Sequence, residues 1–163
     1  MNNKPLILVV DDEASVLFTY RMILEQQGYA ATAVETCKQA VNEVHRHNFD
    51  LLLCDLSLEE KRTGFEVFDA ARESKPDIPC VLLTGYASKE AVDRADREGI
   101  AVLFKPIDIE EFLSTIATLL KDHQHGKAHE QQIRKQSPLR RAWKDLWQDL
   151  GFSGQDPELL RPK

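Results

Sequence analysis

The sequence alternates short apolar runs with longer segments of helical spacing, and this alternation limits the possible folds more than any other feature. Five runs have the length and composition of strands: residues 5–10, 30–34, 51–55, 80–84 and 101–104. Helical spacing follows them at 14–27, from 36 onward, and at 64–74, 89–98 and 108–121. The alternation predicts an α/β fold, with a doubly wound five-stranded parallel sheet, right-handed crossovers and helices on both faces.

Capping residues mark where several of these helices begin and end. Gly28 follows the first helical segment, as expected of a glycine just beyond a helix C-terminus. Thr36 with Gln39, and Asp108 with Glu111, have the spacing of capping boxes and predict two helix starts.

One acidic residue lies where a carboxylate is costly. Asp55 ends the run LLLCD at 51–55, which is apolar enough for a strand buried on both faces. Burial of a carboxylate costs several kcal/mol unless another group compensates it. The position therefore indicates a functional site.

Other acidic residues are expected to lie beside Asp55. In open α/β sheets, ligands bind beyond the carboxyl ends of the strands where the strand order reverses. In the order 2-1-3-4-5 this point lies between the first and third strands. The first strand runs into Asp11, Asp12 and Glu13, of which Glu13 is expected to open the following helix. Carboxylates at this range repel unless a cation lies among them, and hard oxygen ligands suit Mg²⁺.

The remaining strand ends add a hydroxyl group and an ammonium group. Thr84 ends the fourth run, and the fifth leads into Lys105. Carboxylates, a divalent ion, a hydroxyl and a lysine are the groups needed to hold a phosphoryl group. A carboxylate can itself be the acceptor and become an acyl phosphate.

Five motifs in this order resemble the CheY-like receiver domain of response regulators in two-component signalling. The resemblance covers residues 5–120. The motifs are VVDDE (9–13), LLLCDLSL (51–58), TGFEVF (63–68), IPCVLLTGYAS (78–88) and FKPID (104–108).

The resemblance implies that Asp55 accepts a phosphoryl group from a phosphohistidine donor. It implies that the Thr84 hydroxyl turns inward to hydrogen-bond this group and that Lys105 pairs with it. It also implies a cis peptide bond before Pro106. The expected partners are a sensor histidine kinase or phosphotransfer protein, a downstream protein target and, as one option, a second copy of the chain. Apart from assisting its own phosphorylation and dephosphorylation, such a protein is not expected to be an enzyme.

The resemblance also implies a Mg²⁺ site. Its ligands would be the carboxylates of Asp11, Asp12 and Asp55 together with the main-chain carbonyl of Ser57.

The chain departs from the family pattern at three places. The loop LSLEEKRTG lacks the usual Met-Pro pair, and its glycine, Gly64, lies nine residues after the acceptor instead of eight. Val102 occupies a position that often carries an aromatic residue, so an aromatic switch is not expected there. Ser57 and Tyr86 occupy the positions that tune phosphoryl lifetime.

Composition narrows the remaining choices. The 163 residues carry a net charge of −6, with −9 on residues 1–120 (12 Lys/Arg, 21 Asp/Glu) and +3 on 121–163 (9 and 6). An acidic folded part argues against nucleic-acid binding by that part. The three cysteines fit no zinc or disulfide pattern and predict reduced thiols in a cytoplasmic protein. No apolar segment is long enough to predict a membrane span.

We expect residues 1–121 to form the receiver domain and residues 122–163 a C-terminal extension. The extension begins with a polar segment, either a solvated continuation of the last helix or a linker, and contains a predicted amphipathic helix at 138–150, which has both tryptophans on its apolar face. This face could pack on the receiver domain or bind a partner. A DNA-binding regulator with a compact helical output in this extension is an alternative.

The sequence argues against three further classes of protein. A flavodoxin-like flavin carrier needs a phosphate-binding loop after the first strand, which DDEAS is too acidic to form. An aspartyl phosphatase is expected to carry a D-x-D motif there, which the chain lacks. A pseudo-receiver that works without phosphate is the third, and the complete set of five site residues argues against it.

Overall fold

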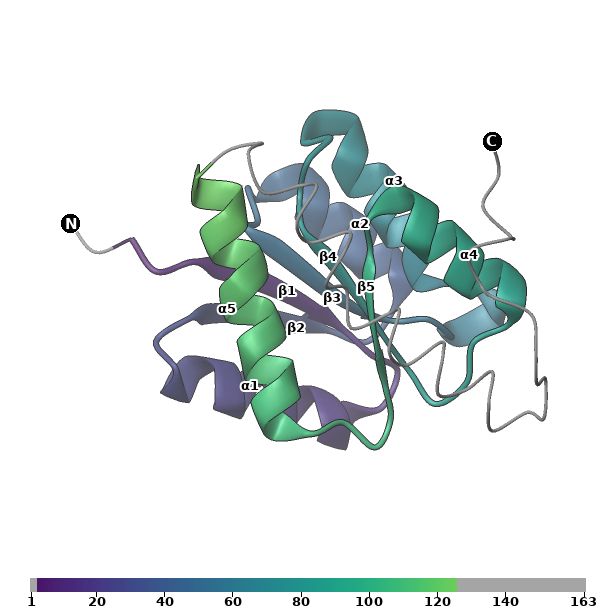
Figure 1. Ribbon diagram of the computed structural model, residues 1–163, viewed down its shortest axis with the longest axis horizontal. Coiled ribbons are helices and arrows are strands. Elements are labelled where there is room, and N and C mark those ends of the chain that lie inside the picture. Colours follow the sequence, from purple (N-terminus) through teal and green to yellow (C-terminus); the bar gives the residue numbers. More distant parts are fainter. Residues whose placement is uncertain (1–2, 126–163) are drawn as a thin grey trace, which may run out of the picture.

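The structure, a computed structural model, describes residues 3–125 as one five-stranded parallel sheet with helices on both faces (Figure 1). The strand order is β2-β1-β3-β4-β5, so the predicted fold and order are confirmed. The strands are β1 Leu6–Val10, β2 Ala30–Val34, β3 Leu51–Asp55, β4 Cys80–Thr84 and β5 Ala101–Phe104. The helices are α1 Ala14–Gln26, α2 Cys37–Arg46, α3 Gly64–Ser74, α4 Lys89–Glu98 and α5 Ile109–His125, with a 3-10 turn η1 at Glu59–Lys61.

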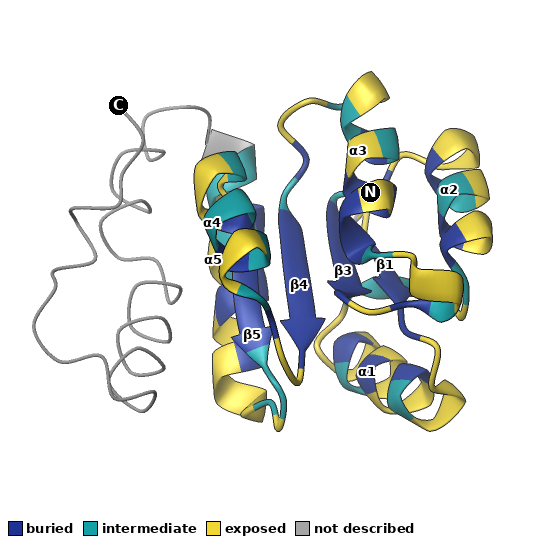
Figure 2. Cartoon of the chain, turned by 90° about the vertical axis from the view of Figure 1, so that its right-hand side faces the viewer, coloured by how far each residue is buried: buried dark blue, intermediate teal, exposed yellow. Residues whose placement is uncertain are grey.

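The sheet separates two hydrophobic cores. Helices α1 and α5 cover one face and α2, α3 and α4 the other (Figure 1). Successive side chains of β3 alternate between the two, with Leu51 and Leu53 facing α1 and α5, and Leu52 and Cys54 facing the other core. All five residues of β3 are buried, as the dark central strand in Figure 2 shows. A strand buried on both faces accounts for the continuous apolar run before Asp55.

The helix ends agree closely with the capping pattern. Thr36 and Gln39 form the expected reciprocal capping box at α2, and the Asp108 carboxylate accepts a hydrogen bond from the Glu111 amide at 2.9 Å. The last helix differs, because α5 continues to His125 instead of ending near 121. The residues after 121 are polar but contain no proline or glycine before 126, so nothing in their composition stops the helix.

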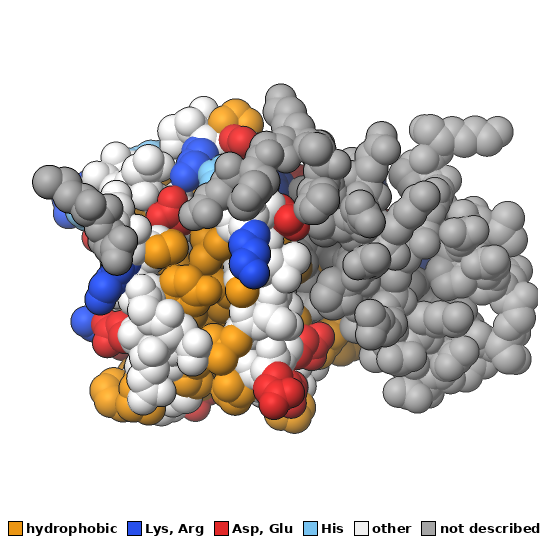
Figure 3. Space-filling view, turned by 60° about the vertical axis from the view of Figure 1, so that its left-hand side comes forward, with side chains coloured by type: hydrophobic (Ala, Val, Ile, Leu, Met, Phe, Trp, Pro, Cys, Tyr) orange, Lys and Arg blue, Asp and Glu red, His pale blue; other side chains and the backbone are white. Residues whose placement is uncertain are grey.

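The predicted C-terminal helix at 138–150 lies outside the described residues, and the division into residues 1–121 and 122–163 stays a prediction. In the described part of the chain, no helix is both long enough and apolar enough to cross a membrane. Figure 3 shows hydrophobic side chains interspersed with charged ones on one face of the molecule. The large hydrophobic residues most exposed among those described are Phe18, Met22, Tyr86 and Ile109.

Candidate functional site

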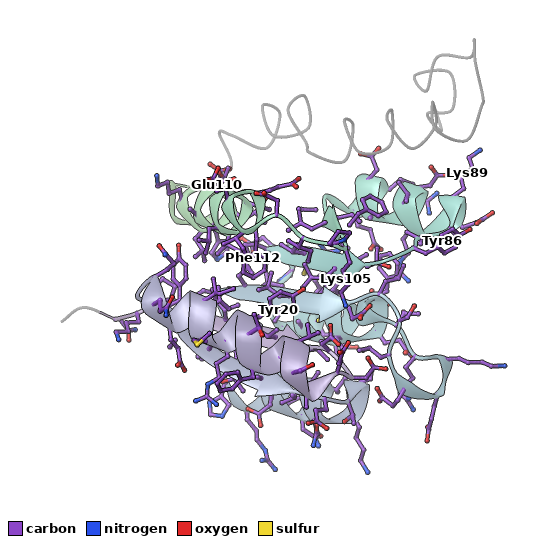
Figure 4. All side chains as sticks on the ribbon, turned by 90° about the horizontal axis from the view of Figure 1, so that it is seen from below. Tyr20, Tyr86, Lys89, Lys105, Glu110 and Phe112 are labelled. Carbon is purple, nitrogen blue, oxygen red and sulfur yellow. The ribbon has the colours of Figure 1, made fainter. Side chains whose placement is uncertain are left out.

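The carboxyl ends of β1, β3 and β5 bring two acidic side chains to one lysine. Lys105, which follows β5, places its Nζ atom 2.9 Å from Oδ2 of Asp11 and 2.9 Å from Oδ2 of Asp55. Asp11 follows β1 and Asp55 ends β3, so the contacts join positions 94 and 50 residues apart in the sequence. Parallel strands end at the same edge of the sheet, and this brings the three residues together. Figure 4 shows Lys105 at this edge, between Tyr20 of α1 and Tyr86.

The acidic residues differ in their exposure. Asp11 is 1% exposed and Asp55 8%, whereas Asp12 is exposed to solvent. Main-chain amides hold the second oxygen of each buried carboxylate: Glu13 donates to Asp11 Oδ1 at 2.9 Å, and Ser57 donates to Asp55 Oδ1 at 3.0 Å. These contacts fix the buried pair, while Asp12 remains accessible to a ligand.

The three carboxylates are suited to a metal ion. Asp11, Asp12 and Asp55 each offer an oxygen atom, and these atoms all lie within 4.8 Å of one another. A set of hard oxygen ligands that is open to water on one side fits Mg²⁺, which usually keeps several waters. Ser57, whose main-chain carbonyl is the fourth predicted ligand, is exposed two residues after Asp55.

Burial and charge act in opposite directions on the site's ionisation. Burial raises the pKa of the Asp55 carboxyl group, and the hydrogen bonds from Lys105 and Ser57 partly oppose this shift. For Lys105, burial lowers the pKa, but the hydrogen bonds to Asp55 and Asp11 outweigh it and hold the pKa above its ordinary value. The lysine therefore stays protonated and neutralises part of the charge on the two carboxylates.

Thr84 ends β4 beside Asp55, because the register pairs Asp55 with Leu83. Its hydroxyl donates a hydrogen bond to the main-chain oxygen of Tyr86 at 2.6 Å and accepts one from the Tyr86 amide at 3.2 Å. The Tyr86 side chain is 79% exposed and lies toward α4 (Figure 4). In this state the hydroxyl is engaged with its own loop, so contact with a group on Asp55 would require it to exchange partners.

The loop after Asp55 accommodates its extra residue without moving the glycine away from the site. Its base is closed by an isolated bridge between Ser57 and Thr63, and Glu60 and Lys61 adopt left-handed backbone angles, with φ of 53° and 62°. Gly64 then begins α3 against the end of β3. A Cβ atom on Gly64 would lie 2.7 Å from the main-chain oxygen of Asp55, which explains why this position needs glycine.

Two other sequence features have clear positions in the structure. Val102 is buried in the core beneath α2, α3 and α4, in keeping with the absence of an aromatic residue there. The Lys105–Pro106 peptide bond is cis, as predicted.

Sequence reasoning missed two contacts at the site. It treated Asp11 and Asp12 alike, whereas of these two carboxylates Asp11 is the one that pairs with Lys105. It also missed the Glu59 side chain, which accepts a hydrogen bond from the Cys37 amide at the start of α2. No local pattern indicates a contact between residues 22 positions apart.

The sequence matches the family model of the response regulator receiver domain over residues 7–117. Among curated relatives, the transcriptional regulatory protein ZraR of Escherichia coli K12 is 29% identical over 154 residues, which cover 94% of this chain and 32% of ZraR. The alginate biosynthesis transcriptional regulatory protein AlgB of Pseudomonas aeruginosa is 31% identical, over 80% of this chain and 30% of AlgB. The chain thus spans about a third of the length of these relatives.

Solved structures agree with this match. A CheY-like response regulator receiver domain protein from Methanospirillum hungatei superimposes with a TM-score of 0.71 at 27% identity, over 76% of this chain and 98% of that one. The beryllofluoride-activated NtrC4 receiver domain dimer gives a TM-score of 0.66 at 28% identity, over 72% and 98% of the two chains.

Proposed function

The chain belongs to the response regulator receiver domain family, and we propose that it is a phosphorylation-dependent signalling switch in which Asp55 accepts the phosphoryl group. The observation that carries this assignment is the pair of 2.9 Å contacts from Lys105 to Asp11 and Asp55 at the carboxyl edge of the sheet. These contacts support the proposal because they hold the proposed acceptor and a second carboxylate against one cation at the edge of the sheet.

The proposed reaction is transfer from a phosphohistidine donor. An oxygen of the Asp55 carboxylate forms a bond to phosphorus, while the bond from phosphorus to the donor's imidazole nitrogen breaks and its electron pair stays on nitrogen. The negative charge of the transferred group would be stabilised by the Lys105 ammonium, which hydrogen-bonds the proposed acceptor carboxylate. A bound Mg²⁺ would stabilise negative charge on the phosphoryl oxygens, as metal ions do in other phosphoryl transfers.

The proposed ligands of that ion are the carboxylates of Asp11, Asp12 and Asp55 and the main-chain carbonyl of Ser57. Support comes from the mutual distances of the three carboxylates and from the exposure of Asp12 and Ser57 on the open side of the site. Because Lys105 already neutralises part of the buried charge, the metal ion and the lysine would share the stabilisation of the phosphorylated state.

Thr84 is proposed to transmit the phosphorylation of Asp55 to the loop that follows β4. Its hydroxyl would leave the Tyr86 main-chain oxygen and donate to the phosphoryl group. The loop from Gly85 to Ser88, which leads into α4, would then lose one of its hydrogen bonds to the site. A changed loop beside the exposed Tyr86 provides a way to alter partner binding.

The proposed partners are a sensor histidine kinase or phosphotransfer protein upstream and a protein target downstream. ZraR and AlgB are named as transcriptional regulatory proteins, so a role in controlling transcription is a reasonable proposal for this chain. The net charge of −9 on residues 1–120 favours action through a protein over direct contact of this part with nucleic acid.

The test is phosphorylation by a small-molecule donor. The full chain is incubated with acetyl phosphate and Mg²⁺ and its intact mass is measured. We expect a gain of one phosphoryl group that is absent in Asp55→Asn and absent without Mg²⁺. If the wild type gains no mass and also fails to bind beryllofluoride with Mg²⁺, the assignment as a phosphoacceptor is wrong.

A further inference from the structure

The loop that follows the acceptor is docked on a neighbouring helix by a side chain that the family motifs do not include. The loop, residues 57–63, lies between the end of β3 and the start of α3. Glu59 Oε1 accepts a hydrogen bond of 2.8 Å from the main-chain amide of Cys37, the first residue of α2. A charged side chain of the loop thus meets the first residue of α2.

The start of α2 has an amide available for this contact. The capping box there uses Thr36 and Gln39: the Thr36 hydroxyl accepts from the Gln39 amide, and the Gln39 side chain accepts from the Thr36 amide. The amide of Cys37 has no partner within the helix, since the first turn of any helix leaves its amides unpaired. Glu59 fills this place, and its negative charge lies at the positive end of the helix dipole.

The contact is specific, because it holds a carboxylate that is partly removed from water. Glu59 Oε2 is buried and finds no hydrogen-bond partner among the described residues. A buried oxygen without a partner carries a desolvation cost, so a side chain free to move would turn it toward solvent. The rest of the loop therefore holds Glu59 in place against α2.

The loop's own hydrogen bonds make it a rigid unit. The Leu58 amide donates to the main-chain oxygen of Arg62 at 2.8 Å, and the Arg62 amide donates to the main-chain oxygen of Glu59 at 2.9 Å. Ser57 and Thr63 form an isolated β-bridge. Leu58 is buried in the core that also contains Cys37. The contact of Glu59 with the Cys37 amide fixes where this unit lies against α2.

This unit carries Ser57, whose amide holds Asp55 Oδ1 at 3.0 Å and whose carbonyl is a proposed metal ligand. We propose that Glu59 is a positioning residue, which by docking the loop on the Cys37 amide sets the place of Ser57 for Mg²⁺ binding and phosphoryl transfer. The inference rests on the proposed function and adds a residue outside the metal and phosphoryl contacts. It also explains how a loop with an unusual sequence can serve the same site.

The test compares Mg²⁺ affinity among variants of the full chain by calorimetry, at a temperature where urea unfolding shows each to be folded. Glu59→Ala removes the acceptor and should raise the Kd for Mg²⁺ about tenfold, the lower end of the range for groups that orient metal ligands. Glu59→Gln keeps an oxygen at the same reach and should stay within about threefold of the wild type. Glu60→Ala is the matched control, because it removes the same charge from the exposed neighbouring residue and should leave the Kd unchanged.

Hydrogen exchange at single amides provides a second readout that does not depend on the metal. In Glu59→Ala the amides of Cys37 and Ser57 should exchange faster than in the wild type, while those of β4 should not change. If Glu59→Ala does not fold, Glu59→Asp takes its place, since it keeps the charge but is one methylene short of the Cys37 amide.

The outcomes separate the two claims. If the wild type binds Mg²⁺ and the alanine or aspartate variant binds it equally well, the positioning role is wrong and the proposed function stands. If Glu60→Ala weakens binding as much as Glu59→Ala, the effect is one of charge and the positioning role is again wrong. A wild type that binds no Mg²⁺ and gains no phosphoryl group contradicts the proposed function itself.

Discussion

Replacing Gly64 with alanine should destabilise the protein, even though alanine normally favours a helix over glycine. A Cβ atom there would lie 2.7 Å from the Asp55 main-chain oxygen, 2.9 Å from Cys54 Cβ and 2.9 Å from Leu82 Cδ2. The leucine methyl can move aside, but the other two atoms belong to the central buried strand. Overpacking of this kind costs about 1–3 kcal/mol, against a gain of about 0.5–1 kcal/mol from removing a helical glycine.

The net expectation for Gly64→Ala is a loss of about 1.5 kcal/mol in the free energy of unfolding. With a urea slope of about 1.5 kcal/mol per M, within the usual range for small domains, the unfolding midpoint should fall by about 1 M. The added Cβ atom should push β3, which carries Asp55, away from α3, so Mg²⁺-dependent binding of beryllofluoride should weaken as well.

Gly85 provides the matched control for this experiment. It directly follows β4, but a Cβ atom on it would meet nothing within 4 Å, and its backbone is not left-handed. Gly85→Ala should leave the midpoint within about 0.3 M of the wild type, as expected for a surface substitution. If Gly64→Ala is as stable as Gly85→Ala, the close approach of α3 to the acceptor does not constrain this position.

Four further results are expected. Lys105→Ala leaves two buried carboxylates facing each other and should lower the free energy of unfolding by about 2 kcal/mol in the absence of Mg²⁺. Added Mg²⁺ should restore part of this loss. An equal loss at all Mg²⁺ concentrations would argue that the ion does not bind between the carboxylates. Asp12→Ala should weaken Mg²⁺ binding measured by calorimetry about tenfold but change stability by less than about 0.5 kcal/mol, because Asp12 is exposed; unchanged affinity would remove Asp12 from the ligand set. Because burial raises the pKa of Asp55 in the folded state, the unfolded chain loses this proton first as pH rises. Urea unfolding should therefore show the stability of the wild type falling relative to Asp55→Asn from about pH 4 up to the folded pKa, and then levelling off. A relative stability that rises over this range would show that the pKa of Asp55 is lowered by folding. A chain shortened to end at His125 should unfold at the same urea concentration as the full chain, as expected if residues 126–163 bind a partner and not the receiver domain; a large loss of stability on shortening would mean that they pack on the receiver domain.

The sequence predicts the sheet well because its strands are buried and sharply bounded. The runs at 30–34, 51–55, 80–84 and 101–104 agree residue for residue with β2 to β5. Each is an apolar segment that ends at a charged or polar residue or a turn, and in a parallel sheet the change in polarity coincides with the end of the strand. The apolar stripe of α5 ends near residue 121 and predicts the end of the helix there, but polarity alone does not end a helix, and α5 continues to His125.

The candidate site follows from topology only in part. Once the strand order is known, Asp11 and Asp55 must lie close together, since β1 and β3 are neighbours. The sequence does not separate the buried Asp11 from the exposed Asp12, because the twist of the chain after β1 decides which side chain points inward. Glu59 contacts Cys37 from a loop that has left-handed backbone angles at two non-glycine residues, a conformation that composition does not reveal.

Direct mapping of the phosphoryl group tests the central claim that Asp55 is the acceptor. The full chain is phosphorylated with acetyl phosphate and Mg²⁺, the acyl phosphate is reduced with borohydride, and the digested peptides are sequenced by mass spectrometry. Because Asp55 is the carboxylate that Lys105 and the Ser57 amide hold at the open edge of the site, we expect its conversion to homoserine and no change at Asp11 or Asp12. Reduction at Asp12 or at any acidic residue other than Asp55 would contradict the assignment.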